Sequence, residues 1–371
     1  MNDVVVAGGG LIGMSVAWRC AKKGLRVTVV DADPTQGAGQ AAAGMLAPVA
    51  EATYGEERLL GLARASLKRY PAFVAELQQA TGVDVALRTA GTLQVGFDAD
   101  DTRVLDDLHA FHLELGLPAE RLTPTQARRV EPSLTTRVRG AVRIPSDHSV
   151  DARAVRDALT VAARQAGATV LTTGVEALVT ADGRATGLRL ADGTTIAAGT
   201  VVLALGAWSA SLPGVPPLPV RPVKGQILRL RRAAGLLDGT VRALVRGRAV
   251  YLVPLRDDQL IIGATVEEQG FDRSVTAGGV YELLRDAIEV VPGVTECELT
   301  ETLVRFRPGT PDNAPLLGDS DLPGLVLATG HYRNGVLLAP VTGEAIAELI
   351  ADGALPEAAR GFGTDRFRER S

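Results

Sequence analysis

One arginine and one tyrosine in the second half of the chain have the chemistry to bind a small carboxylic acid. Arg307 directly precedes a Pro-Gly pair, which we expect to fix its backbone in a turn, and its guanidinium can bind a carboxylate through two parallel hydrogen bonds. Tyr251 lies on an expected alternating strand, where its phenol can hydrogen-bond a small polar substrate. Taken alone, Arg307 could equally be a surface arginine and Tyr251 a packed core tyrosine.

The segment 330–335, Gly-His-Tyr-Arg-Asn-Gly, is a second place where charge can be stabilised. It lies between an expected buried strand over 324–328 and an expected last helix over 336–350. Such a turn directs the N-terminus of the following helix outward, and the N–H groups and positive dipole end there stabilise negative charge. We therefore expect this turn to border a reaction site.

The first thirty residues carry the pattern of a dinucleotide site. Residues 4–7 are small and apolar, as in a buried strand, and Gly8, Gly10 and Gly13 follow, with Asp31 at the end of the next strand. The glycines permit a tight turn, the approach of backbone to a pyrophosphate and the packing of helix on strand. The carboxylate of Asp31 can accept hydrogen bonds from ribose hydroxyls. This pattern alone does not separate FAD from NAD.

The remaining elements alternate between α/β and β-rich segments. A second buried strand runs over 201–205 into Gly206, where backbone could also approach a cofactor, and five prolines within 213–222 mark a crossing between domains. The other expected elements are helices over 10–23, 58–80, 100–115, 123–132, 152–165 and 274–290, a strand pair over 88–97, a strand over 169–171, a hairpin over 175–196 and alternating strands over 226–266.

The interleaving predicts an α/β protein, α+β overall, with two domains built from separated pieces. A Rossmann-like dinucleotide-binding domain would comprise residues 1–86, 145–215 and 305–371. A domain with an antiparallel sheet, which would bind the substrate, would comprise residues 87–144 and 216–304.

Composition and charge exclude several classes of protein. The chain has 371 residues, 46% of them hydrophobic, and a net charge of −4, so we expect a soluble protein without a nucleic-acid surface. We expect no membrane span, no signal peptide before the first strand and a cytoplasmic location. Cys20 and Cys297 lack motif spacing, which argues against disulfides and a metal site, and Cys20 is expected to be buried. Asp147 and His148 are interpreted as solvated turn residues.

Five features in a fixed order carry a resemblance to a known family. They are the glycine fingerprint, the loop Ala41-Ala42-Ala43-Gly44-Met45, Tyr251, the segment Arg307-Pro308-Gly309-Thr310 and the block over 330–340. Together they resemble the D-amino-acid-oxidase family of flavoproteins over nearly the whole chain, with the closest likeness to its glycine-oxidase branch. Two positions depart from the family pattern: Gln40 replaces a common serine or threonine, and Val266 stands where a methionine can occur.

The resemblance implies FAD as the cofactor. No histidine occurs in the first 108 residues and neither cysteine lies in a flavin-facing motif, so the FAD is expected to be non-covalent. The residues implied to contact it are Gly8, Gly10, Leu11, Ile12, Gly13, Asp31, Ala32, Ala38, Gly39, Ala43, Gly44, Met45, Val175, His331, Tyr332, Arg333, Asn334, Gly335, Val336 and Leu337, to which the strand analysis adds Gly206.

The resemblance also implies a substrate and a reaction. Arg307 would bind the carboxylate of a small amino acid, Tyr251 and Arg333 would act beside it, and Met45 would line the same pocket. The implied reaction is oxidative deamination of glycine, sarcosine or a small D-amino acid by hydride transfer from the α-carbon to flavin N5. Oxygen would then give hydrogen peroxide, and the imine would yield glyoxylate and ammonia or pass to thiazole synthase for thiamine.

Three other functions remain open from the sequence. The first is a D-amino-acid dehydrogenase of the same fold that passes electrons to a quinone. The second is a nicotinamide enzyme, and the third is a dinucleotide-binding protein without catalysis. The sequence also leaves open whether the protein is a monomer or a homo-oligomer.

Overall fold

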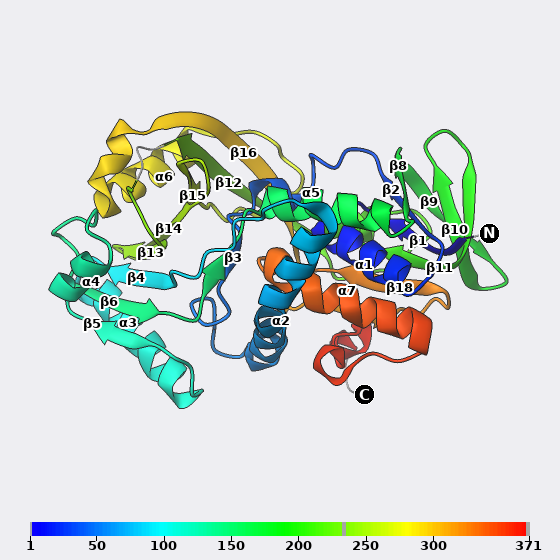
Figure 1. The fold of residues 1–371 in the computed structure, drawn as a ribbon, viewed down its shortest axis with the longest axis horizontal. Helices are drawn as coiled ribbons and strands as arrows, with labels where there is room; N and C mark the ends of the chain where they lie inside the picture. The colour runs from blue at the N-terminus through cyan, green and yellow to red at the C-terminus, as the bar shows by residue number, and fades with distance from the viewer. Residues whose placement is uncertain (1, 232–234, 369–371) are drawn as a thin grey trace.

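Two eight-stranded sheets form the frame of the protein in the computed structural model, which describes residues 2–231 and 235–368 (Figure 1). Residues 1, 232–234 and 369–371, which belong to the predicted domain ranges, lie outside the described residues. The first sheet has the order β17-β18-β11-β1-β2-β8, and the β9–β10 hairpin pairs with β11. Its strands are β1 Asn2–Ala7, β2 Val27–Asp31, β8 Thr169–Thr172, β9 Val175–Ala181, β10 Arg184–Leu190, β11 Thr195–Leu203, β17 Leu316–Asp319 and β18 Leu325–Thr329.

Five strands of the first sheet are parallel neighbours, as a dinucleotide-binding sheet requires. β18, β11, β1, β2 and β8 pair in parallel, and their residues are contributed by both ends and the middle of the chain. β17 is antiparallel to β18. The alternation of helices with buried apolar strands therefore produced the expected α/β layer.

The second sheet has the order β16-β12-β15-β14-β13-β4-β6-β5 and is antiparallel except for the β13–β4 pair. Its strands are β4 Thr92–Gly96, β5 Glu120–Leu122, β6 Gly140–Ile144, β12 Arg221–Arg231, β13 Thr240–Val245, β14 Arg248–Pro254, β15 Gln259–Gly263 and β16 Glu298–Gly309, while β3 Met45–Leu46 and β7 His148–Ser149 form a separate ribbon. Two sheets made of discontinuous segments confirm the predicted fold class; the exact domain boundaries stay a prediction.

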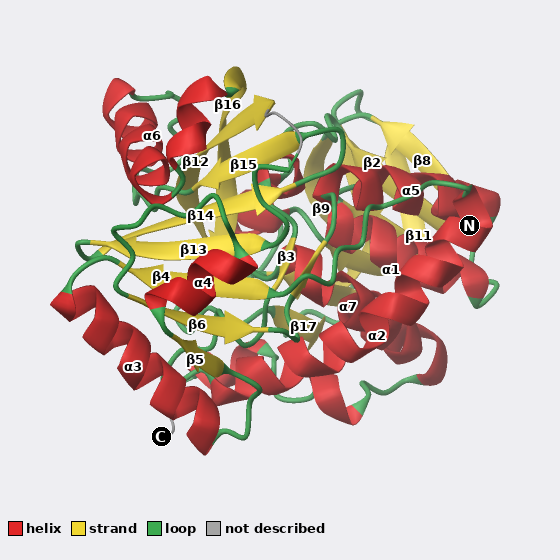
Figure 2. Ribbon diagram, turned by 60° about the vertical axis from the view of Figure 1, so that its left-hand side comes forward, coloured by secondary structure: helices red, strands yellow, loops and turns green. Residues whose placement is uncertain are grey.

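Helices cover the two sheets in separate groups. α1 Leu11–Lys22, α2 Glu57–Thr81, α5 Ala152–Gln165 and α7 Gly335–Asp352 pack together beside the first sheet (Figure 1). α6 Ala277–Val290 packs on β12 to β15, and α3 Ala99–Glu114 packs on β4 and β6, with α4 Pro124–Val130 nearby (Figure 2). No helix in the described part of the chain is long and apolar enough to cross a bilayer.

Strand alternation gives the second sheet two different faces. Leu252 and Ile262 pack in the core with Leu283 of α6. Tyr251 and Ile261, each one residue earlier, belong to a different cluster on the opposite face. Because successive side chains of a strand point to opposite faces, one face is left to line a cavity.

One predicted element is wrong. The segment 88–97 forms a single strand, β4, instead of a strand pair. Gly91, with a φ of +86°, turns the chain before β4, and Arg88 makes only an isolated bridge to Ser149.

The contact between α1 and α7 depends on a glycine. A Cβ atom on Gly343 would lie 2.3 Å from Ser15 Oγ and 2.9 Å from Ser15 O. The Ser15 hydroxyl itself donates to Ala339 O over 2.7 Å. The close approach of the two helices therefore leaves no room for a side chain at position 343.

Gly343→Ala is expected to lower the free energy of unfolding by about 1–3 kcal/mol, because the added methyl overpacks this contact. Gly61→Ala is the matched control, since a Cβ atom on this helical glycine would meet nothing within 4 Å. It should raise stability by about 0.5–1 kcal/mol through the lower entropy of the unfolded chain. Urea denaturation of both variants tests this, and equal effects would contradict the packing argument.

Candidate active site

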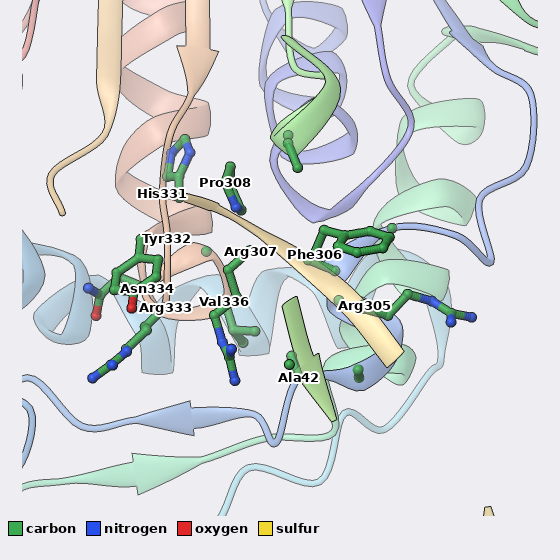
Figure 3. A pocket seen from close by; sticks show the side chains of 18 of the residues that line it. Ala42, Arg305, Phe306, Arg307, Pro308, His331, Tyr332, Arg333, Asn334 and Val336 are labelled. Atoms are coloured by element: carbon green, nitrogen blue, oxygen red, sulfur yellow. The ribbon is translucent and has the colours of Figure 1, made fainter. Parts of the chain in front are cut away.

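A cavity of about 950 Å³ is lined by residues from both sheets. This volume is at the upper end of the range for ligand pockets, so it has room for a cofactor and a small substrate together. Its walls include the start of α1, the segment 36–45, parts of β13, β14 and β16, and the turn before α7 (Figure 3).

Nearly all residues predicted to form the site border this cavity. They are Gly8, Gly10, Leu11, Ile12, Asp31, Ala32, Ala38, Gly39, Ala43, Gly44, Met45, Val175, Gly206, Tyr251, Arg307, His331, Tyr332, Arg333, Asn334, Gly335 and Val336. Gly13 and Leu337 are not brought to it. A Cβ atom on Gly13 would lie 1.9 Å from Gly8 O, which suits its expected role in helix packing, and Leu337 is buried in the core. The roles of these residues remain predictions.

The glycine fingerprint forms a cradle of backbone at one end of the cavity. Gly8 has a φ of +104°, and a Cβ atom there would lie 2.4 Å from Ala204 O. A Cβ atom on Gly10 would meet no protein atom within 4 Å, so this side of the backbone is open. α1 begins at Leu11 without a side-chain cap. The free N–H groups of its first turn fit the pyrophosphate of a dinucleotide.

Asp31 closes the same end of the cavity. Its Oδ2 accepts a hydrogen bond from Gly9 N over 2.6 Å, and its Oδ1 accepts one from Asp33 N over 3.0 Å. These bonds fix the carboxylate at the end of β2, as the fingerprint predicts. The residues present therefore fit FAD at this end.

A second helix N-terminus faces the cavity from the other end of the chain. α7 begins at Gly335, and its N-cap Asn334 makes no side-chain cap. Pro340 lacks the N–H that would pair with Val336 O, and the buried hydroxyl of Tyr70 donates to this oxygen over 3.0 Å. The first turn of α7 is thus held in place while its N–H groups stay available for negative charge on a cofactor.

His331 is a neutral residue in the wall. Burial lowers its pKa to about 3, and its Nε2 lies 3.0 Å from Thr342 Oγ1. Cys20 is buried as predicted, its pKa is raised to about 12 by burial, and it does not border the cavity. Among residues 2–231 and 235–368, no three His, Cys, Asp or Glu side chains group as metal ligands.

Arg307 is positioned by a strand, and the expected turn is wrong. β16 continues through Pro308 to Gly309, and Arg307 pairs with Val223 of β12. A Cβ atom on Gly225 would lie 2.4 Å from Arg307 Nη1, so this glycine makes space for the guanidinium. Arg307 Nη1 donates to Thr265 O over 3.1 Å. Figure 3 shows the Arg307 side chain leaving β16 on the same side as Arg333.

Tyr251 lies beside this arginine on the cavity face of the second sheet. Its cross-strand neighbour is Gly263, and a Cβ atom there would lie 2.3 Å from Tyr251 Oη. Burial raises the pKa of Tyr251, although the charge of Arg307 opposes the rise. The phenol therefore stays protonated at neutral pH and can donate a hydrogen bond.

An ion pair in the cavity wall was missed by sequence reasoning. Arg242 of β13 is the cross-strand neighbour of Tyr251, and its Nη1 donates to Glu51 Oε1 over 2.7 Å. The same nitrogen lies 3.8 Å from Met45 Sδ. The local signal was an arginine among the apolar residues 241–245 of this strand.

Asp147 is fully buried, so its interpretation as a solvated turn residue is wrong. Its two carboxylate oxygens accept hydrogen bonds from Val49 N over 3.3 Å and Ala50 N over 3.2 Å. Burial raises its pKa to about 7, and these bonds and Arg242 only partly oppose the rise. His148 is partly buried, with Nδ1 2.8 Å from Asp147 O. Asp147 thereby anchors the turn that carries Glu51 to the cavity.

Asp147→Asn is expected to flatten the dependence of stability on pH. The wild-type carboxyl has a pKa near 7 when folded and 3.8 as its ordinary value, so the native state binds more protons and stability falls as pH rises between them. Between pH 5 and pH 8 the free energy of unfolding of the Asn variant should rise by about 2–3 kcal/mol relative to that of the wild type. Exposed Asp157→Asn is the control, and parallel unfolding curves for wild type and Asp147→Asn would contradict this.

Comparison with known proteins confirms the resemblance drawn from the sequence. Residues 3–349 match the family described as "DAO: FAD dependent oxidoreductase". The glycine oxidase of Geobacillus kaustophilus is 36% identical, over 94% of this chain and 92% of its own. The bifunctional protein ThiO/ThiG of Trichormus variabilis is 35% identical over the whole chain, which spans 56% of that relative. The chain thus covers about half the length of the bifunctional relatives it matches.

Solved structures agree with these relatives. The crystal structure of glycine oxidase from Geobacillus kaustophilus superposes with a TM-score of 0.87 at 35% identity, covering 96% of this chain and 98% of that one. The iminodiacetate oxidase of Chelativorans sp. BNC1 has a TM-score of 0.85 at 28% identity, covering 95% and 96%. The fingerprint, the two uncapped helix ends and these matches lead to one conclusion. This chain belongs to the DAO family of FAD-dependent oxidoreductases, and its cofactor is FAD.

Proposed function

We propose that the protein is an oxidase of glycine, or of a similarly small amino acid such as sarcosine or a small D-amino acid. The observation that carries this proposal is a guanidinium and a protonated phenol, from Arg307 and Tyr251, in the cavity bordered by the FAD fingerprint. The likeness to glycine oxidases supports it.

Arg307 is suited to bind the substrate carboxylate. Its Nη1 donates to two backbone oxygens, Thr265 O at 3.1 Å and Lys224 O at 3.5 Å, and its guanidinium also interacts with the Tyr251 phenol. A substrate carboxylate would then bind to this guanidinium and accept the hydroxyl proton of Tyr251 in a hydrogen bond. Arg333 adds an exposed positive charge at the cavity, with its guanidinium carbon 5.0 Å from the Tyr332 ring centroid.

Two titratable side chains of the cavity wall are poorly suited to act as general bases toward the substrate amine. The low pKa of His331 makes it a weak proton acceptor, and Glu51 is paired with Arg242. The substrate amine therefore reacts in its neutral form, and the protein contributes alignment of the carboxylate against the cofactor. FAD bound in this cavity would supply the acceptor for the hydride from the substrate α-carbon, and oxygen would take up the two electrons and give hydrogen peroxide.

The products follow from this balance of atoms. The amino acid loses a hydride from carbon and a proton from nitrogen and becomes an imine, which water converts to glyoxylate and ammonia when the substrate is glycine. We propose that the imine can instead pass to thiazole synthase in thiamine biosynthesis, a proposal supported by the likeness to bifunctional ThiO/ThiG proteins. The N-terminus of α7 supports the reaction by stabilising negative charge.

Anaerobic addition of glycine to the purified protein with non-covalent FAD is expected to bleach the flavin absorption. Readmitted air should restore the colour and yield one hydrogen peroxide per glycine oxidised. If no peroxide forms in air but the protein reduces a dye or a quinone, the result favours the dehydrogenase alternative. A coloured protein that no small amino acid bleaches would refute the proposed activity.

Arg307→Ala is expected to raise the KM for glycine by about ten- to a hundredfold, because a charge-assisted hydrogen-bonded contact to the carboxylate is lost. FAD affinity should change little. Arg26→Ala is the control, since this arginine pairs with Asp3 on the surface and neither residue borders the cavity. Steady-state kinetics measure both, and an unchanged KM for Arg307→Ala would remove this residue from the site.

A further inference from the structure

The segment 264–276, which we name the strap, connects β15 to α6 and passes over the cavity. Ala264, Val266 and Arg273 of the strap border the cavity. Phe271 stacks on Trp208 with ring centroids 5.4 Å apart and an interplanar angle of 17°. The strap therefore joins the second sheet to the 3-10 turn that follows β11 in the first, and its position shapes the site.

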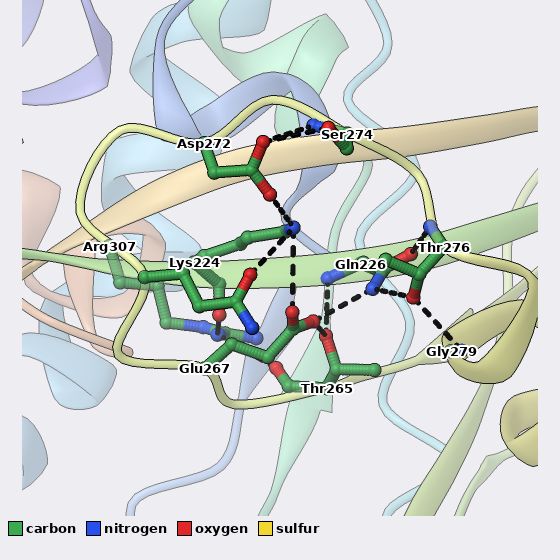
Figure 4. A network of polar contacts seen from close by, with 10 residues as sticks. Lys224, Gln226, Thr265, Glu267, Asp272, Ser274, Thr276, Gly279 and Arg307 are labelled. Atoms are coloured by element: carbon green, nitrogen blue, oxygen red, sulfur yellow. Dashed lines mark hydrogen bonds and ion pairs between the residues drawn. The ribbon is translucent and has the colours of Figure 1, made fainter.

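A buried lysine fastens the strap to β12. Lys224 is fully buried, and its Nζ lies 2.5 Å from Asp272 Oδ2 and 3.4 Å from Glu267 Oε2 (Figure 4). Its backbone N donates to Glu267 O over 2.9 Å, and Glu267 N donates to Lys224 O over 3.0 Å. The pairing with Asp272 raises the pKa of Lys224 and lowers the pKa of Asp272 to about 2. The lysine and its two carboxylate partners are therefore all charged at neutral pH.

The same network continues from Glu267 to the arginine. Thr265 Oγ1 donates to Glu267 Oε1 over 2.6 Å and accepts from Gln226 N over 2.8 Å. These bonds hold the Thr265 residue, whose backbone oxygen accepts from Arg307 Nη1 over 3.1 Å. Figure 4 shows the Thr265 and Glu267 side chains between Lys224 and the strap backbone.

The carboxylate of Glu267 reaches Arg307 only through Thr265, whose backbone oxygen accepts the hydrogen bond from the guanidinium. In the described part of the chain Arg307 makes no ion pair, and a neutral carbonyl orients it. Of the three acidic groups of the strap, Glu267 and Asp272 pair with Lys224, and Glu268 pairs with Arg221. The charge of Arg307 stays available for a substrate, while its long, flexible side chain is fixed in direction.

We propose that Lys224 is a positioning residue that holds the strap on β12 and thereby presents Arg307 to the substrate carboxylate. This inference rests on the proposed role of Arg307. It assigns to Lys224 an effect on substrate binding rather than on the chemical step. Arginine at position 224 keeps the positive charge and can still pair with Glu267 or Asp272, whereas methionine keeps the apolar stem and removes the charge.

The test compares Lys224→Met, Lys224→Arg and Asp272→Asn in the FAD-loaded protein. Lys224→Met is expected to raise the KM for glycine about tenfold while kcat stays within about twofold, and Lys224→Arg should recover most of the loss. Binding of glycolate, a carboxylate without an amine, should weaken by a similar factor when followed through the flavin spectrum. Lys23→Met, which breaks an exposed pair with Asp352, is the control and should change neither value.

A second measurement needs no cofactor or turnover. Trypsin should cleave the apoprotein after exposed Arg273 faster in Lys224→Met than in wild type, because the strap is released. The effects of Lys224→Met and Asp272→Asn on the KM should be non-additive in the double variant, since each substitution breaks the Lys224–Asp272 pair. If Lys224→Met does not fold, Asp272→Asn alone decides, because Asp272 is partly exposed.

Two outcomes separate this inference from the proposed function. An unchanged KM for Arg307→Ala would refute the role of Arg307 itself. The second outcome is a raised KM for Arg307→Ala, while Lys224→Met and Asp272→Asn keep the KM and the glycolate affinity of the wild type. This result would refute only the role of Lys224. Equal losses in kcat, FAD content and glycine binding for Lys224→Met, without rescue by Lys224→Arg, would also overturn it.

Discussion

The central constraint in this protein is an arginine whose positive charge is oriented but not neutralised. Arg307 is partly buried, and its Nη1 donates to the backbone oxygen of Thr265. A buried charge is costly without a partner, and a carbonyl compensates it less than a carboxylate does. Under the proposed function, a substrate carboxylate that binds to Arg307 would therefore gain free energy that an ion pair within the protein would otherwise already have gained. Gly225 and Gly263, which leave room for the guanidinium and for the Tyr251 phenol, follow from this requirement.

One face of the second sheet supplies this arrangement because strand pairing aligns residues that are remote in sequence. Gln94, Arg242, Tyr251 and Gly263 are successive cross-strand neighbours on β4, β13, β14 and β15. Side chains on the opposite face pack under α6. The alternation of side chains along these strands thus builds both the core under α6 and the polar wall of the cavity. A shift of one residue in the pairing of any of these strands would turn its core side chains toward the cavity and its cavity side chains toward the core.

The sequence predicted those parts of the site whose chemistry is local. The fingerprint works through neighbouring backbone, so Gly8, Gly10 and the strand end at Asp31 could be placed from spacing alone. Tertiary pairings could not be found this way. In the sequence Asp147 looks like a turn residue, and only the folded structure brings the N–H groups of residues 49 and 50 to its carboxylate. No residue next to Arg307 in the sequence indicates that Thr265 O accepts its hydrogen bond. Alternation predicted strands, but it does not state which strands are neighbours.

The distribution of charge around the cavity is compatible with the proposed binding of a carboxylate by an acidic protein. The chain carries a net charge of −4, and among the several carboxylates that line the cavity Glu51 is paired with Arg242. Asp147, with its pKa raised by burial, stands behind the wall and does not border the cavity. Arg307 and Arg333 then face the cavity without a carboxylate partner among the described residues. Because fields focus in clefts with low-dielectric walls, the charges closest to a bound ligand, here Arg307 and Arg333, act on it more strongly than the overall charge of the chain does.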